Sequence, residues 1–133
     1  GAMGDGTPAA IASARRHPRR KVLCLVGDGG FMMTGNEMIA AAERRLPILF
    51  VLSNNGSYAS IRIHQEHQYP GRVSGTSLHN PDFQALAAAF GMPCRRIEHA
   101  GQIDDIVAHA MAQDGPMFVE VRSSLSAVLP TVR

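Results

Sequence analysis

The sequence predicts the α/β class, with a parallel sheet that carries helices on both faces. Residues 21–26 and 47–53 form two short strand patterns with continuously apolar interiors at 22–26 and 48–52, a pattern typical of parallel strands covered on both sides. Helical patterns alternate with these runs and with two weaker strand patterns, as they do in α/β folds. The chain has 133 residues, and we expect a single domain over residues 1–133.

The first half of the chain predicts two helices and the two apolar strands. Thr7 is a favourable N-cap residue and Pro8 suits the first helical position, so a helix is expected over residues 9–16. The first strand follows this helix. A second helix over residues 35–45 has an apolar face and leads into the second strand.

The second half begins with a long irregular stretch at residues 57–77, and long loops in compact domains are often functional. Asn80-Pro81 starts a helix with an apolar face, and Gly91 stops it. We expect the apolar face of this helix to pack in the core, and we expect the same of the last helix described below. The remaining elements are the two weaker strands at 94–98 and 117–122, and the last helix with the stripe Ile103, Ile106, Val107, Ala110 and Met111.

Composition and charge exclude several classes of protein. Thirteen Lys and Arg against eleven Asp and Glu leave a net charge of +2, so we expect no nucleic-acid partner and assign the basic stretch 15–21 to a solvated loop. The longest apolar run, 46–52, is far shorter than the about 20 residues that a membrane span needs. Cys24 and Cys94 cannot form a disulfide framework, and no secretory signal is visible, so we expect a cytoplasmic protein.

A glycine-rich turn lies between the first strand and the next helix. Ligands of open parallel sheets bind beyond the carboxyl ends of the strands, which is where this turn is expected. Glycines let the backbone approach an anion closely, and free amides near a helix start can bind phosphate. The acidic residue within Gly27-Asp28-Gly29-Gly30 would repel a bare diphosphate, so it predicts a divalent cation between the carboxylate and the phosphate.

The second strand ends in a matching place, at Ser53-Asn54-Asn55-Gly56-Ser57. An amide oxygen there is a hard, neutral ligand that suits Mg²⁺ or Ca²⁺. If the two strands are neighbours, Asp28 and Asn55 converge on one ion. The alternative is that both segments are only turns, since Gly, Asn and Asp dominate turns. Their joint position at two strand ends favours the metal site.

Three separated motifs carry a resemblance to a known family. Gly27-Asp28-Gly29, followed after residues 30–53 by Asn54-Asn55, resembles the thiamine diphosphate motif. Residues 1–11 resemble the G-x-M-G-x-G-x-P-A-A-I segment of the acetolactate synthase-like branch, and residues 54–66 resemble the stretch after the motif in that branch. The sequence is therefore similar to the thiamine diphosphate-dependent enzymes of the acetolactate synthase-like family, from residue 1 to about residue 130.

The resemblance implies the thiamine diphosphate-binding fold and the C-terminal, diphosphate-binding domain of such an enzyme. Mg²⁺ would be bound by the Asp28 carboxylate, the Asn55 side chain and the backbone carbonyl of Ser57. Met3 matches the bulky residue that keeps the cofactor bent, with a core methionine as the alternative, and the Gly1 carbonyl matches the acceptor for the cofactor's amino group. The other residues implied to bind the cofactor are those of the glycine turn and of the second strand end: Gly27, Gly29, Gly30, Ser57 and Tyr58.

The implied activity is decarboxylation of a small 2-oxo acid with transfer of the acyl unit to a second carbonyl. In the family, the activating glutamate lies on a different domain of the neighbouring subunit. No acidic residue here matches it, so we expect no catalytic residue in this chain and no turnover by the chain alone. The pyruvate decarboxylase branch has a glutamate at the position of Ile61, which disfavours a simple decarboxylase.

Alternatives stay open on activity and on assembly. The chain could serve a 2-oxo acid decarboxylase of the single-chain or two-subunit type, or be a non-catalytic module that retains the cofactor fold. We expect it to be a piece of a longer enzyme or a natural small subunit. Its expected partner is a pyrimidine-binding domain of the same or a neighbouring subunit, within a homo-oligomer, and apolar surface should be exposed where that partner packs. Use of FAD is left open, and nothing in this chain indicates it.

Overall fold

Parallel strands form a single sheet in the computed structural model, which describes residues 2–127. The strand order is β1-β2-β4-β3, so β1 and β3 are the edge strands. The bounds are Val22–Gly27 for β1, Ile48–Asn54 for β2, Cys94–Ile97 for β3 and Met117–Arg122 for β4. These bounds nearly coincide with the predicted strands, and the α/β class is confirmed.

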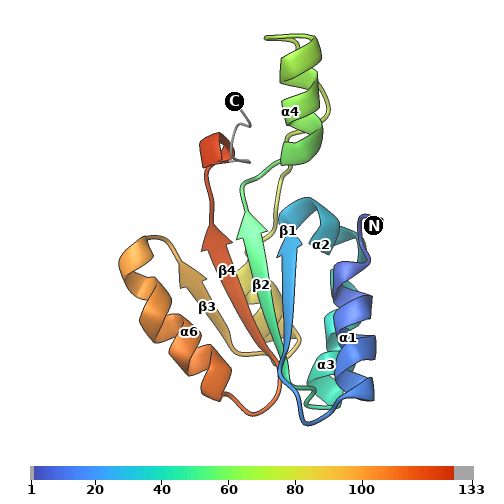
Figure 1. Ribbon diagram of the computed structural model, residues 1–133, viewed down its shortest axis with the longest axis vertical. Helices are drawn as coiled ribbons and strands as arrows, with labels where there is room; N and C mark the ends of the chain where they lie inside the picture. Colours follow the sequence, from blue (N-terminus) through green and yellow to red (C-terminus); the bar gives the residue numbers. More distant parts are fainter. Residues whose placement is uncertain (1, 128–133) are drawn as a thin grey trace.

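Helices lie on both faces of the sheet, with α1 and α3 on one side and α6 on the other (Figure 1). Within residues 2–127 none of them is long and apolar enough to cross a membrane. The helices are α1 (Gly6–Arg16), α2 (Asp28–Thr34), α3 (Met38–Glu43), α4 (Ala59–Gln68), α5 (Phe83–Ala89) and α6 (Ile103–Ala112), with short 3₁₀ turns η1 (Gly35–Glu37), η2 (Ala100–Gln102) and η3 (Leu125–Ala127).

The main core lies between the sheet and helices α1, α2, α3 and α5. Its centre is a group of three fully buried phenylalanines from different elements. The ring centroid of Phe31 is 5.8 Å from that of Phe83 and 5.3 Å from that of Phe118. Both distances are typical of favourable aromatic packing. This group joins α2, α5 and β4, and so fixes the start of α2 relative to the sheet.

The first turn of α2 corrects one prediction from the sequence. The expected helix over 35–45 is preceded by a separate helix that begins at Asp28, directly after β1. Phe31 explains this early start, because a helical turn after Asp28 brings its ring into the core. α1 also begins earlier than predicted, with Asp5 rather than Thr7 at the N-cap position.

The opposite face of the sheet is only partly covered. α6 packs over β3 and β4, where Ile97, Ala110 and Val119 belong to a smaller buried cluster. It does not cover β1, whose Leu23 and Leu25 are 56% and 70% exposed. The prediction that both apolar strands are covered on two sides therefore holds for β2 and is wrong for β1.

The stripe of α6 differs from the prediction in the same way. Ala110 is buried and Ile106 is half-buried, but three of its other apolar residues remain exposed: Ile103, Val107 and Met111. An apolar cavity of about 200 Å³ lies between α6 and the sheet. Because the leucines of β1 and one side of α6 are exposed, this face of the sheet presents an apolar surface that the domain itself does not cover.

Helix α4 lies in the stretch that the sequence predicts to be irregular. It extends beyond the carboxyl ends of β1, β2 and β4 (Figure 1), and each of its residues is half-buried or exposed. The two ends of the stretch are joined by an antiparallel bridge between Ser57 and Ser77. Because α4 packs little of its surface on this domain, its sequence carries no strong apolar stripe, and the periodicity needed to predict it is missing.

Candidate functional site

The carboxyl ends of β1 and β2 lie side by side at one edge of the sheet. Their register pairs Gly27 with Ser53, so the turns that follow both strands meet. The backbone N–H of Gly56 donates to Asp28 Oδ2 at 2.8 Å. The two turns that the sequence predicts to converge are therefore in direct contact.

Asp28 is a buried carboxylate at the floor of this site, with 1% of its surface exposed. Among the described residues, its oxygens accept from the backbone N–H of Gly29 at 3.0 Å, that of Gly56 at 2.8 Å and Asn80 Nδ2 at 2.7 Å. All of these partners donate, which suits an ionised carboxylate because that group can only accept. The contacts come from three segments and fix the position of both oxygens.

The turn after β2 orients the second predicted metal ligand. Asn55 Oδ1 accepts the backbone N–H of Ser57 at 3.0 Å, which forms a local Asx turn. Gly56, between them, has φ +68°, a conformation that side-chain-bearing residues rarely adopt. Ser57 is buried, and its hydroxyl donates to the backbone carbonyl of Thr76 at 2.8 Å. The hydroxyl is thus engaged behind the turn, so that a ligand role for Ser57 falls to its backbone carbonyl.

Tyr58 packs directly on the glycine turn. A Cβ atom added to Gly29 would lie 2.5 Å from the ring atoms Cδ1 and Cε1 of Tyr58, a separation that real Cβ atoms do not reach. Only glycine fits at this position while the ring keeps its place. Gly29 and Gly30 are also in the first turn of α2, where backbone N–H groups have no backbone acceptor within the helix, and the N–H of Gly29 donates to the Asp28 side chain.

A cleft of about 360 Å³ opens above these residues. Met3 lies at its edge and is 50% exposed, so it is not a core methionine. Gly1 falls outside the described residues. The cleft brings together the other residues that the sequence predicts to bind a cofactor, namely Met3, Gly27, Asp28, Gly29, Gly30, Asn55, Ser57 and Tyr58, and Ala59, Ser60 and Ile61 complete its lining.

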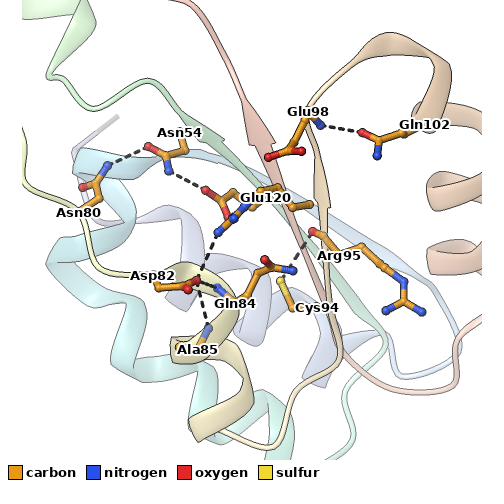
Figure 2. A network of polar contacts seen from close by, with 11 residues as sticks. Asn54, Asn80, Asp82, Gln84, Ala85, Cys94, Arg95, Glu98, Gln102 and Glu120 are labelled. Atoms are coloured by element: carbon orange, nitrogen blue, oxygen red, sulfur yellow. Dashed lines mark hydrogen bonds and ion pairs between the residues drawn. The ribbon is translucent and has the colours of Figure 1, made fainter.

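Behind the cleft lies a polar network that sequence reasoning missed. Asn80 and Asn54 face one another, and Asn54 faces Glu120 (Figure 2). The carboxylate of Glu120 also accepts from Arg96 Nε at 2.7 Å, and this hydrogen bond raises the pKa of Arg96. The one signal that could have indicated the network is Glu120 itself, an acid within the otherwise apolar start of the strand Met117–Arg122.

The far end of this network lies at the start of α5. Asp82 caps that helix by accepting from the backbone N–H groups of Gln84 and Ala85, and these bonds lower its pKa. It also accepts from Arg96 Nη2 at 3.3 Å. Nearby, burial above all, together with the charge of Glu120, raises the pKa of Cys94 to about 11, so its thiol is protonated at neutral pH.

The amino-acid sequence matches the family described as "Thiamine pyrophosphate enzyme, C-terminal TPP binding domain" over residues 1–121. The chain belongs to this family. The resemblance stated from the three motifs is therefore confirmed, and the cleft at the ends of β1 and β2 lies in a TPP binding domain.

Relatives of this TPP binding domain include acetolactate synthase large subunits and a benzoylformate decarboxylase. The domain is 35% identical over 134 residues to the isozyme 2 large subunit of Escherichia coli K12, with 99% of this chain and 24% of that subunit covered. It is 37% identical over 134 residues to the large subunit of Lactococcus lactis, with 99% and 23% covered. Benzoylformate decarboxylase of Pseudomonas aeruginosa is 29% identical over 121 residues, with 91% and 23% covered. The chain thus spans about a quarter of the length of these relatives.

The oxygen atoms of the cleft suit a diphosphate bound through a divalent cation. Asp28 offers a carboxylate, Asn55 an amide oxygen and Ser57 a backbone carbonyl, all of them hard ligands of the kind that Mg²⁺ prefers. Across residues 2–127, no three His, Cys, Asp or Glu side chains gather as a possible metal site. Asp28 is the one carboxylate among the residues that line the cleft, so a cation bound there would be held by this carboxylate and neutral oxygens, with the phosphate supplying the remaining charge.

Proposed function

We propose that this chain binds the diphosphate of thiamine diphosphate through Mg²⁺, as the C-terminal domain of an acetolactate synthase-like enzyme. The observation that carries this proposal is the buried Asp28 carboxylate, joined to the turn of Asn55 and open to a cleft lined by glycines. A buried acid beside a glycine turn has little use in a purely structural module, because burial of a charge is costly unless the charge has a partner.

Different residues of this chain would bind the metal ion, the diphosphate and the rest of the cofactor. Asp28, Asn55 and the Ser57 carbonyl would bind Mg²⁺, and the backbone amides of Gly29, Gly30 and the residues around Tyr58 would contact the diphosphate. Met3, at the edge of the cleft, would support the bent form of the cofactor. The bound cofactor would supply the chemistry that removes carbon dioxide from a 2-oxo acid.

A calorimetric titration with thiamine diphosphate tests this proposal. We expect the chain to bind thiamine diphosphate when Mg²⁺ is present and to lose that binding when Mg²⁺ is removed with a chelator. Because the chain contacts the diphosphate end, inorganic diphosphate should compete, and thiamine without its phosphates should not bind. Equal affinity with and without Mg²⁺, or equal binding of thiamine, would contradict the proposal.

For the reaction of the complete enzyme, we propose decarboxylation of a small 2-oxo acid with transfer of the acyl unit to a second carbonyl. The acetolactate synthase relatives and Ile61 support this activity. The likeness to benzoylformate decarboxylase favours a 2-oxo acid decarboxylase as the second candidate. Product analysis with pyruvate and with benzoylformate separates the two: acetolactate from pyruvate supports the first, and benzaldehyde from benzoylformate the second.

We also propose that the activating glutamate belongs to a pyrimidine-binding domain outside this chain, in the same or a neighbouring subunit of a homo-oligomer. The chain by itself would then hold the cofactor without turning it over, and release of carbon dioxide from pyruvate by the 133-residue chain alone would refute this. The free thiols of Cys24 and Cys94 favour a reducing compartment, so we place the enzyme in the cytoplasm.

The exposed apolar face of β1 and α6 is the surface on which we propose that another part of the enzyme packs. Leu25 is 70% exposed on an edge strand, where unpaired backbone groups and apolar side chains promote association. In the chain studied alone, this face should cause self-association.

Replacing Leu25 by glutamate should therefore shift the isolated chain toward the monomer, because a charge on this face opposes its burial. Light scattering after gel filtration measures the change across a range of concentrations. Ile39→Glu is the matched control, since Ile39 is an exposed apolar residue of α3, away from this face. If Ile39→Glu dissociated the chain and Leu25→Glu did not, the surface would be assigned wrongly.

A further inference from the structure

The polar network behind the cleft contains two buried carboxylates. Glu120, with 1% of its surface exposed, lies on β4, and Asp28 lies at the start of α2. The side chains of Asn54 and Asn80 connect them through hydrogen bonds. Figure 2 shows the contacts from Glu120 through Asn54, at the end of β2, to Asn80, in the segment before α5. The network therefore joins the proposed metal ligand, which follows β1, to strand β4.

Because a carboxylate lies on each side, the side-chain amides of Asn54 and Asn80 can be oriented in only one way. Glu120 Oε1 can only accept, so Asn54 turns Nδ2 toward it, and these atoms are 2.7 Å apart. The oxygen of Asn54 then faces Asn80, which has to donate: Asn80 Nδ2 lies 2.9 Å from Asn54 Oδ1. The same Nδ2 lies 2.7 Å from Asp28 Oδ2. Both protons of the Asn80 amide are thereby used.

Arg96 explains why Glu120 can be charged at this depth. Its Nε donates to Glu120 Oε2 at 2.7 Å, and the neighbouring strands place the two residues in register. With Arg96 Nε on Oε2, the other oxygen of Glu120 faces Asn54 as an acceptor. The charge pair between β3 and β4 thus sets the direction of every hydrogen bond up to Asp28.

We propose that Asn80 is a positioning residue for Asp28, and that Glu120, acting through Asn54, sets the direction in which Asn80 donates. This inference rests on the proposed function, because it assigns Asp28 to Mg²⁺. It gives a role to Asn54, which precedes the predicted ligand Asn55 and has no ligand role itself. Residues that orient a metal ligand affect metal affinity by about 10–100-fold when they are removed.

Binding of Mn²⁺ in place of Mg²⁺ tests the inference on the 133-residue chain. Free Mn²⁺ is followed by electron paramagnetic resonance in the presence of inorganic diphosphate, and the midpoint of thermal unfolding, Tm, is measured in parallel. We expect Asn80→Ala to raise the Kd for Mn²⁺ at least tenfold. Asp82→Ala is the control, because it removes the cap of α5 and the outer partner of Arg96 without reaching Asp28. It should lower Tm and leave the Kd unchanged.

A pair of substitutions tests the direction of the hydrogen bonds that run from Asp28 through Asn80 and Asn54 to Glu120. This test does not require the Asn80→Ala variant to fold. Asn54→Asp places two carboxylates together, and Glu120→Gln leaves either Arg96 or Asn54 without an acceptor, so each change alone should weaken Mn²⁺ binding. In the double variant, the carboxylate introduced at position 54 would accept both from the amide introduced at position 120 and from Asn80. The double variant should therefore regain most of the affinity.

The outcomes separate the two proposals. If the unaltered chain does not bind Mn²⁺ with diphosphate, the proposed function and the positioning role fail together. If it binds, but Asn80→Ala binds equally well while Asp28→Asn does not, only the positioning role is overturned. The same holds if Asp82→Ala weakens binding as much as Asn80→Ala, or if the double variant is no better than the single ones.

Discussion

Replacing Asp28 by asparagine is expected to abolish Mg²⁺-dependent binding of thiamine diphosphate, with Kd raised by more than about 100-fold. The change removes the negative charge that would balance the cation, and hydrogen bonds to charged groups contribute more than neutral ones do. It also puts an NH₂ group where Asp28 now accepts, on one oxygen from Gly29 and on the other from Gly56 and Asn80. In either orientation of the amide, a donor would then face a donor.

Calorimetry with Mg²⁺ held constant measures this loss, and circular dichroism establishes whether the variant is folded. Asp104→Asn is a suitable control, since it removes one negative charge from an exposed position on α6, far from the cleft. It should bind the cofactor as the unaltered chain does. A folded Asp28→Asn variant with undiminished affinity would mean that the diphosphate is held without this carboxylate, and the proposed metal site would have to be given up.

The strands of the sheet could be predicted because most of their apolar residues match positions that are buried in the fold. Residues 48–52 are all apolar because β2 lies in the interior of the sheet and packs on both faces. The same pattern at residues 22–26 led to a wrong expectation, because Leu23 and Leu25 of β1 are exposed here. The apolar sequence of a strand does not show which of its faces this domain covers and which it leaves exposed.

The cleft was predictable from the order of its parts, since both turns follow strands of one parallel sheet. The network behind it was not, because Asn80 and Glu120 become neighbours of Asn54 only through the strand order β1-β2-β4-β3. A single asparagine before a helix reads as a cap, and the structure gives that task to Asp82. Contacts between residues distant in sequence require the fold before they can be inferred.

Replacing Phe31 by alanine is expected to lower the free energy of unfolding by about 3–5 kcal/mol, the range for removal of a buried aromatic side chain. Its ring is fully buried against Phe83 and Phe118, so the substitution leaves a cavity where α2, α5 and β4 meet. Urea denaturation followed by circular dichroism measures this change. Met32→Ala is the matched control: Met32 follows Phe31 on the same helix and is half exposed, so its loss should be small.

The effect of Phe31→Ala should reach the cleft as well as the core. Asp28 and Phe31 are one helical turn apart on α2, and the ring is the contact that fixes this short helix against the sheet. Once the ring is removed, the hydrogen bonds of Asp28 to Gly56 and Asn80 have to hold the start of α2 by themselves. We therefore expect weaker Mg²⁺-dependent cofactor binding even at temperatures where the variant is folded. Unchanged affinity in a folded, destabilised variant would show that the polar contacts suffice to position Asp28.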